Sequence, residues 1–158
     1  MTIKTIKIYT NSKAEQLGRK WQKKSHRKIA VISIGDIFHP SVGLQSGGSI
    51  VDVFHLNFLD LNPNKDYAQK IPELHDLVDK YKAKPEDFKG LSEFVDKISN
   101  QCDVLIISSP EGYSRAASLA AAIEEYIGFP DLVWCNRRLK PNEYVYQLAG
   151  DYLCGKYI

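Results

Sequence analysis

The chain has 158 residues, 44% of them hydrophobic and 25% charged, and its formal net charge is +2 at pH 7. This length suits one domain, residues 1–158, with a full hydrophobic core. The small net charge implies no strong general attraction to nucleic acid or to a membrane surface. No apolar run approaches the length of a membrane-spanning helix.

The cysteines and the N-terminus indicate the compartment. Cys102, Cys135 and Cys154 lack the spacing of a metal site, and their odd number argues against a disulfide framework. Met1 to Ile8 mixes apolar and charged residues and does not have the pattern of a signal peptide. We therefore expect a reducing, cytoplasmic location, with neither a metal nor another cofactor.

The chain begins with a predicted strand and a predicted helix. Ile3 to Tyr9 alternates apolar and polar residues, which is typical of an edge strand. In the helix that follows, Asn11 or Ser12 is the expected N-cap, and Glu15 is placed for a capping box. We interpret the basic segment from Arg19 to Lys28 as a solvated helix end; the alternative is a patch for an acidic partner or nucleic acid.

Two more strands follow, joined by a long loop. Lys28 to Gly35 predicts a largely buried strand, and Ser49 to Phe58 predicts a strand with rough alternation. The loop between them, from Asp36 to Gly48, is rich in Gly and Ser. We favour a flexible surface connection, and the alternative is a lid or pocket wall. His39 is expected at the surface rather than in catalysis.

Two helical stretches then precede the centre of the chain. Asp66 to Tyr81 carries apolar residues at helical spacing, and Pro85 suits the first turn of the next helix. Both stretches are expected to pack on the body of the protein. We interpret His75 and its acidic neighbours as solvated surface rather than a metal site. The second stretch has a predicted buried face of Phe88, Leu91, Phe94, Val95 and Ile98.

The rest of the chain is organised around residues Cys102 to Ala116. The apolar run from Val104 to Ile107 predicts a buried central strand, and a loop with Pro and Gly follows from Ser108 to Ser114. Arg115 then opens an Ala-rich helix that Gly128 is expected to end. This order directs backbone N–H groups and the positive end of a helix at one point, where an anion can bind.

We call the loop from Ser109 to Arg115 the cradle. Arg115 adds a planar fork of donors that fits phosphate or sulfate, so the residues predict an oxyanion cradle for a phosphate ester. This prediction requires that the loop does not splay outward and that no carboxylate holds the guanidinium elsewhere. A last helix is expected from about Asn142 to Cys154. Alternating strands and helices predict an α/β fold, with a mostly parallel central sheet flanked by helices and a ligand site at the carboxyl ends of the strands.

The cradle resembles the phosphate-binding loop of the protein tyrosine and dual-specificity phosphatases, written C-x-x-G-x-S-R. Gly112, Ser114 and Arg115 match that pattern, whereas Ser109 stands where the family has its nucleophilic Cys. Fragments elsewhere are similar to the small bacterial and phage branch of the family: Ser33 to Asp36, Phe58 to Asp60, Pro141-Asn142 and Val145-Tyr146.

The resemblance implies a single phosphatase-like domain and a set of site residues. Ser109 would fill the nucleophile slot, Arg115 would clamp the phosphoryl oxygens, and Asp60 would be the general acid, unless it only turns the chain. Ser114 is expected to hydrogen-bond within the loop. The implied phosphate-binding residues are Ser109, Glu111, Gly112, Tyr113, Ser114 and Arg115.

The serine changes the chemistry that the resemblance implies. A Cys in such a loop attacks as a thiolate of lowered pKa, whereas the hydroxyl of Ser109 has a far higher pKa and no base is visible beside it. Pro110 also removes one N–H group from the cradle. Cys102 precedes the strand and lies too far along the chain to replace the nucleophile. Binding is therefore expected to survive without thiolate chemistry.

Three functional hypotheses remain open. The first is a phosphatase-like protein without hydrolysis that binds a phosphorylated protein or a small phosphorylated metabolite or nucleotide. The second is an active phosphatase whose Cys has been replaced by Ser109. We prefer natural divergence, because Ser108 and Pro110 also depart from the family. The third is a protein-interaction module that keeps the loop as a relic. None of these predicts an oligomeric state.

Overall fold

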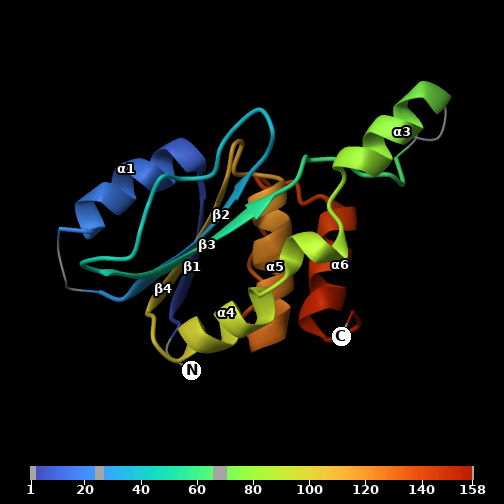
Figure 1. Cartoon of the computed structure of the whole chain (residues 1–158). Coiled ribbons are helices and arrows are strands. Elements are labelled where there is room, and N and C mark those ends of the chain that lie inside the picture. Colours follow the sequence, from blue (N-terminus) through green and yellow to red (C-terminus); the bar gives the residue numbers. More distant parts are fainter. Residues whose placement is uncertain (1–2, 24–26, 66–70, 158) are drawn as a thin grey trace.

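Four parallel strands form the centre of the computed structural model, which describes residues 3–23, 27–65 and 71–157. The strands lie in the order β1-β4-β2-β3 (Figure 1). This arrangement confirms the predicted α/β fold with a parallel central sheet and places β1 at an edge. The strands are β1 Thr5–Thr10, β2 Ile29–Gly35, β3 Ile50–Asn57 and β4 Val104–Ser109.

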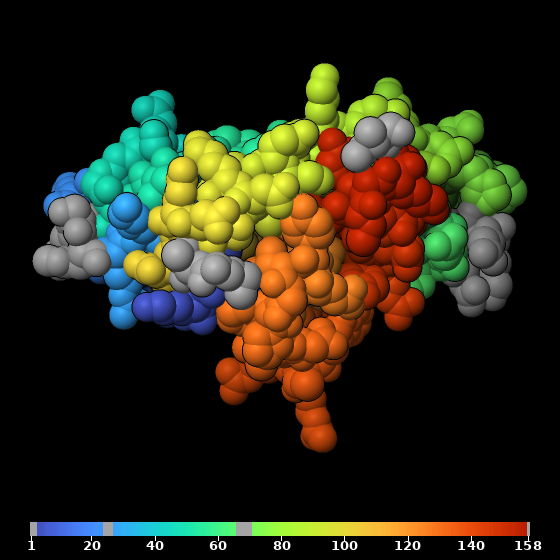
Figure 2. Space-filling model, turned by 90° about the horizontal axis from the view of Figure 1, so that it is seen from below, coloured from blue at the N-terminus to red at the C-terminus, as the bar shows by residue number. Residues whose placement is uncertain are grey.

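Helices cover both faces of the sheet, with α1 on one face and α4, α5 and α6 on the other (Figure 1). Figure 2 shows α4 in yellow, α5 in orange and α6 in red on the latter face. No helix among the described residues is both long enough and apolar enough to cross a membrane. The helices are α1 Asn11–Trp21, α3 Pro72–Tyr81, the 3-10 helix η1 Pro85–Phe88, α4 Leu91–Ser99, α5 Arg115–Ile127 and α6 Glu143–Leu153.

The two inner strands, β2 and β4, divide the core into two layers. Ala30, Ile32 and Ile34 of β2 belong to the larger core under α4, α5 and α6, whereas Ile29 and Val31 belong to the smaller core under α1. Successive side chains of a strand point to opposite faces, and both faces of these strands are covered. This explains why their sequences are apolar almost throughout.

The predicted cap of α1 is wrong by one residue. The N-cap is Thr10, whose hydroxyl accepts a hydrogen bond from the Lys13 N–H at 3.1 Å, rather than Asn11 or Ser12. Asn11 is instead turned toward the sheet, where its Nδ2 donates to the Ile34 carbonyl at 2.8 Å. The partly buried contact of the Asn11 amide with β2 therefore takes priority over the local capping preference.

The loop from residue 36 to residue 48 lies mostly at the surface, as we favoured, but two of its side chains anchor it to the body. Val42 and Leu44 are buried against α1 in the smaller core. Glu15 accepts a hydrogen bond from the Gly43 N–H at 2.7 Å, and it does not close the capping box predicted for it. The close approach of Leu44 also explains the glycine in α1, because a Cβ on Gly18 would lie 2.3 Å from the Leu44 side chain.

The helix predicted from Asp66 to Tyr81 begins later and packs less than expected. Residues 66–70 lie outside the described residues, and α3 begins at Pro72. Val78 is its one buried residue, whereas Leu77 and the preceding Ile71 are exposed. Figure 1 shows α3 projecting from the body, so little of its apolar stripe is covered.

The second helical stretch is divided in two. Pro85 lies in the first turn of η1, as predicted, but Gly90 then adopts a φ of +89° and separates η1 from α4. The predicted buried face is confirmed on both sides of this break, because its members are all buried: Phe88, Leu91, Phe94, Val95 and Ile98.

The Ala-rich helix after β4 lies in the middle of the larger core. Residues 115 to 124 of α5 are all buried, because small side chains let this helix lie close to the sheet and to α6. Gly128 ends α5 in the left-handed conformation, with a φ of +74°, as predicted. The predicted strand, loop and helix around the cradle are therefore all present.

Candidate functional site

The cradle lies at the carboxyl end of β4, beside the end of β2 and in the centre of the sheet. Ser109 is the last residue of β4, and α5 begins at Arg115, so the whole turn is completed in five intervening residues. Its residues differ in exposure: Ser109, Gly112, Ser114 and Arg115 are buried, and Glu111 and Tyr113 are exposed.

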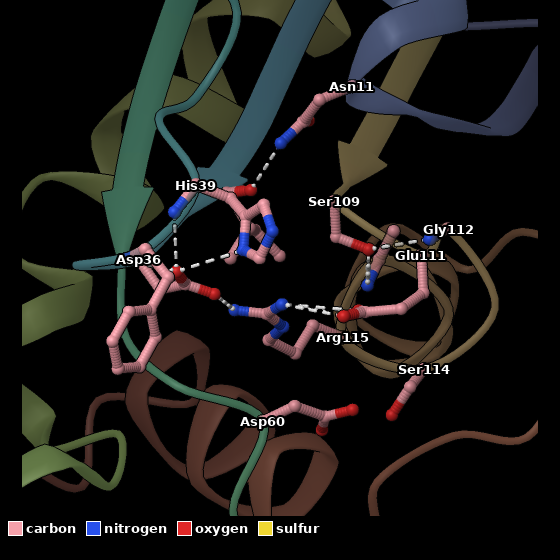
Figure 3. A network of polar contacts seen from close by, with 12 residues as sticks. Asn11, Asp36, His39, Asp60, Ser109, Glu111, Gly112, Ser114 and Arg115 are labelled. Atoms are coloured by element: carbon pink, nitrogen blue, oxygen red, sulfur yellow. Dashed lines mark hydrogen bonds and ion pairs between the residues drawn. The ribbon is translucent and has the colours of Figure 1, made fainter.

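One backbone amide of the cradle and one from the first turn of α5 converge on the Ser109 hydroxyl. Its oxygen accepts hydrogen bonds from the Gly112 N–H at 3.1 Å and from the Ala116 N–H at 3.3 Å (Figure 3). Among the described residues, neither a carboxylate nor an imidazole contacts this hydroxyl. The geometry therefore stabilises a negative oxygen near Ser109 but provides no base that would activate the hydroxyl.

Arg115 places its guanidinium in the interior next to the cradle, with 1% of the residue exposed. Nη1 donates to the Asp36 Oδ2 at 2.9 Å and to the Phe58 carbonyl at 2.7 Å. Nη2 donates to both carboxylate oxygens of Glu111, at 3.1 and 3.3 Å (Figure 3). Nε is buried and has no hydrogen-bond partner among the described residues. The cradle is not splayed, so the first condition for an oxyanion cradle is met. The second condition is not met, because two carboxylates hold its guanidinium.

Asp36 is the part of the site that the sequence did not identify as functional. It follows β2 directly, and its Oδ1 accepts hydrogen bonds from the N–H groups of Phe38 and His39, both at 2.8 Å. Burial opposes ionisation of Asp36, but the bond to Arg115 and the two backbone N–H groups outweigh it, so the pKa of Asp36 lies below its ordinary value. Asp36 is therefore a fixed anionic partner of Arg115.

One signal in the sequence could have identified Asp36. A carboxylate directly after a predicted inner strand lies at the same edge of the sheet as the cradle, because the strands are parallel. His39, expected at the surface, is exposed, and its Nδ1 lies 3.5 Å from the Asp36 Oδ1.

Asp60 lies beside the cradle but does not contact Arg115 among the described interactions. Its Oδ1 accepts a hydrogen bond from the Asn142 Nδ2 at 2.9 Å. Figure 3 shows the Asp60 carboxylate and the Ser114 hydroxyl pointing toward one another, and both residues line a hollow of about 330 Å³. The structure thus brings Asp60 near the loop, and its role as a general acid remains a prediction.

The side chains of Ser114 and Tyr113 make no hydrogen bond among the described contacts. The expected hydrogen bond of the Ser114 hydroxyl within the loop is absent from the described contacts, and this side chain faces the hollow instead. Tyr113 has an exposed ring, and its carbonyl accepts a hydrogen bond from the Lys140 N–H at 2.8 Å. That bond ties the loop to the segment before α6.

The described part of the chain suggests neither a metal site nor nucleophilic attack by Cys102. There, no group of three or more His, Cys, Asp or Glu side chains is arranged to hold a metal ion. Cys102 is buried, and burial raises the pKa of its thiol to about 11, which makes it a poor nucleophile.

Comparison with known proteins supports the fold. No family model and no curated protein matches the sequence. Among solved structures, the human tyrosine phosphatase-like serine/threonine/tyrosine-interacting protein is similar, with a TM-score of 0.53 and 19% identity over 97% of this chain and 93% of that one. Human DUSP28 gives a TM-score of 0.47 and 12% identity over 96% of this chain and 92% of that one. The first of these likenesses shows that the chain has the fold of a tyrosine phosphatase-like protein.

Proposed function

We propose that this protein is a phosphatase-like binding protein that holds a phosphorylated ligand in the cradle without hydrolysing it. The ligand is a phosphorylated protein segment or a small phosphorylated metabolite or nucleotide. The observation that carries this proposal is the Arg115 Nε, a buried donor without a partner among the described residues. A buried unpaired donor is costly, and an oxygen of a bound anion would satisfy it.

The surroundings of Arg115 support the same ligand class. The N-terminus of α5 lies at the cradle, and two amides already point at one position beside it. The two nearby carboxylates, Asp36 and Glu111, oppose a doubly charged phosphate. We therefore expect selective but modest affinity.

Absence of hydrolysis follows from the Ser109 environment. The two N–H groups that donate to this hydroxyl favour a negative oxygen, but a serine hydroxyl has a far higher pKa than a thiol. With no base beside it among the described residues, the hydroxyl stays protonated at neutral pH. Asp60 has no contact with it that would compensate. The cradle would therefore recognise a phosphoryl group and leave its bonds intact.

We infer that Ser109 is a natural departure from the C-x-x-G-x-S-R pattern and that the chain diverged from the small bacterial and phage branch. The buried Ser108 supports this inference, because its hydroxyl donates to the Asn11 Oδ1 at 2.6 Å and Ser33 donates to the same oxygen at 2.9 Å. Ser108 is thus built into its surroundings. The name of the similar human protein contains the words phosphatase-like and interacting, which suits recognition rather than turnover.

The proposal predicts that inorganic phosphate and sulfate raise the melting temperature of the native protein, since a ligand that binds only the folded state stabilises it. Arg115→Lys keeps the charge but loses the planar fork, so the shift should fall strongly. Arg138→Lys is the matched control at an exposed arginine and should leave the shift unchanged. If the natural sequence shows no shift even at high anion concentration, the interaction-module hypothesis is favoured instead.

A second assay separates a binding protein from an active phosphatase that has lost its Cys. We expect no turnover of a simple aryl phosphate by the protein with Ser109 and none by Ser109→Cys, because among the described residues no general acid contacts the cradle and Arg115 is shared with Asp36 and Glu111. Strong turnover by Ser109→Cys would favour the active-phosphatase hypothesis.

A further inference from the structure

We propose that Glu111 is an internal ligand of the cradle. Its carboxylate holds the guanidinium of Arg115 until an incoming oxyanion exchanges with it. This inference rests on the proposed function, because it describes how the same site is kept closed. It predicts that Glu111, rather than Asp36, sets the affinity of the cradle for anions.

Glu111 uses only one of the two nitrogens on one edge of the Arg115 guanidinium. Nη2 and Nε form one edge of a guanidinium, and an oxyanion fits this edge best when it accepts from both nitrogens. Glu111 brings both of its oxygens to Nη2, at 3.1 and 3.3 Å, and leaves Nε without a partner among the described residues. An oxyanion that reaches both nitrogens gains a hydrogen bond that Glu111 does not make.

The two carboxylates around Arg115 differ in how firmly they are held. The Asp36 side chain is 4% exposed, and both of its oxygens accept hydrogen bonds. The Glu111 side chain is 38% exposed, and Arg115 is its one partner among the described residues. Glu111 can therefore turn into solvent, whereas Asp36 stays in place.

Displacement of Glu111 leaves the guanidinium charge neutralised by Asp36. Arg115 is buried, but the Glu111 end of the pair reaches solvent, so water competes for that carboxylate and a long side chain must be ordered to form the pair. A tetrahedral oxyanion is thus able to compete with Glu111. The site would stay closed to weak anions and open to those that use the edge formed by Nη2 and Nε.

The test uses sulfate, whose charge is constant near neutral pH, at fixed ionic strength. Glu111→Gln keeps the shape of the side chain and removes its charge, so we expect sulfate to bind roughly two- to fivefold more tightly than to the natural sequence. Glu93→Gln is the matched control, because Glu93 is exposed and lies on α4, outside the cradle and the hollow beside Ser114. It should leave the affinity unchanged.

A second measurement follows the Nε–H group of Arg115, which has no partner among the described residues. The Nε–H signal of Arg115 in a ¹H–¹⁵N spectrum is identified by its loss in Arg115→Lys. We expect sulfate to shift this signal in the natural sequence, and to shift it at a lower concentration in Glu111→Gln. Glu111→Ala provides the same comparison if the Gln variant is unstable.

The possible failures can be told apart. Equal sulfate affinity for Glu111→Gln and the natural sequence, with the Nε–H signal shifting in both, would overturn the internal-ligand inference and leave the proposed function standing. No sulfate binding by either protein, with no shift of that signal, would overturn both.

Discussion

At the scale of single residues, Gly112 determines the shape of the cradle. Its φ of +82° lies in the left-handed region, which residues with a side chain rarely adopt. A Cβ at this position would also lie 3.1 Å from the Thr10 nitrogen and from the Tyr9 carbonyl carbon in β1. The glycine of the loop pattern therefore has two physical causes, one in its own backbone and one in the neighbouring strand.

Gly112→Ala is predicted to destabilise the protein by about 1–3 kcal/mol, the usual cost of a strained backbone position. Gly150→Ala is the matched control, because Gly150 lies within α6 with open space around it. There alanine should stabilise the helix by about 0.5–1 kcal/mol. Urea unfolding measures both values, and a similar effect of the two substitutions would contradict this account of Gly112.

The local parts of the site could be predicted from the sequence, and the distant partner could not. Ser109, Gly112 and Arg115 lie within one short loop, so their spacing alone indicates a cradle. Asp36 lies 79 residues from Arg115 in the chain, and only the pairing of β2 with β4 brings the two together. Contact of the guanidinium with Asp36 therefore depends on tertiary structure, whereas its pair with Glu111 is local.

At the scale of helices and strands, Asn142 joins the start of α6 to the segment after β3. Its Oδ1 accepts hydrogen bonds from the Tyr144 and Val145 N–H groups at 3.0 and 3.3 Å. Its Nδ2 donates to the Asp60 carboxylate and to the Leu61 carbonyl. One side chain thus caps a helix and holds the candidate acid in position.

Asn142→Ala is predicted to cost about 1–2 kcal/mol, the range for loss of an N-cap. Asn142→Asp retains a good cap but replaces the two donated hydrogen bonds with a carboxylate facing Asp60. We therefore expect Asn142→Asp to loosen the Asp60 segment while α6 remains stable, as measured by amide hydrogen exchange. Unchanged exchange around residues 60–62 in both variants would show that Asn142 does not hold this segment.

The helices also show that apolar periodicity predicts a helix face but not whether another element covers it. Periodicity correctly predicts that α3 and α4 have an apolar face, because that pattern is a local property of each helix. Whether another element covers the face depends on the rest of the fold. Phe94 and Ile98 of α4 are buried, whereas Leu77 of α3 is exposed.

At the scale of the whole molecule, two carboxylates make opposite contributions to stability as the pH changes. Burial raises the pKa of Glu124 above its ordinary value of 4.5, although the N–H groups of Val133 and Leu132 oppose this shift at 3.2 and 3.1 Å. The pKa of Asp36 is lowered from 3.8. Glu124 holds the segment after α5, and Asp36 holds Arg115, so the two act on separate parts of the fold.

Whether each carboxylate adds or removes stability as the pH rises depends on which state, folded or unfolded, binds more protons. Between pH 4.5 and the raised pKa, folded Glu124 keeps a proton that the unfolded chain has lost, so its contribution to stability falls as the pH rises. Folded Asp36 is ionised where the unfolded chain is already protonated. Its contribution is complete well above pH 3.8 and is lost as the pH falls through 3.8 toward the lowered value.

Free energies of unfolding measured in urea between about pH 3 and 7 test both signs. Relative to the natural sequence, Glu124→Gln should gain stability progressively as the pH rises from 4.5, because the neutral amide carries no penalty for ionising in a buried position. The free energy of unfolding of Asp36→Asn should fall less steeply at acid pH than that of the natural sequence, because the amide has no charge to lose. Glu86→Gln, at an exposed carboxylate, is the control and should follow the natural profile. If Glu124→Gln ran parallel to the natural sequence across this range, burial would not be the feature that governs the ionisation of Glu124.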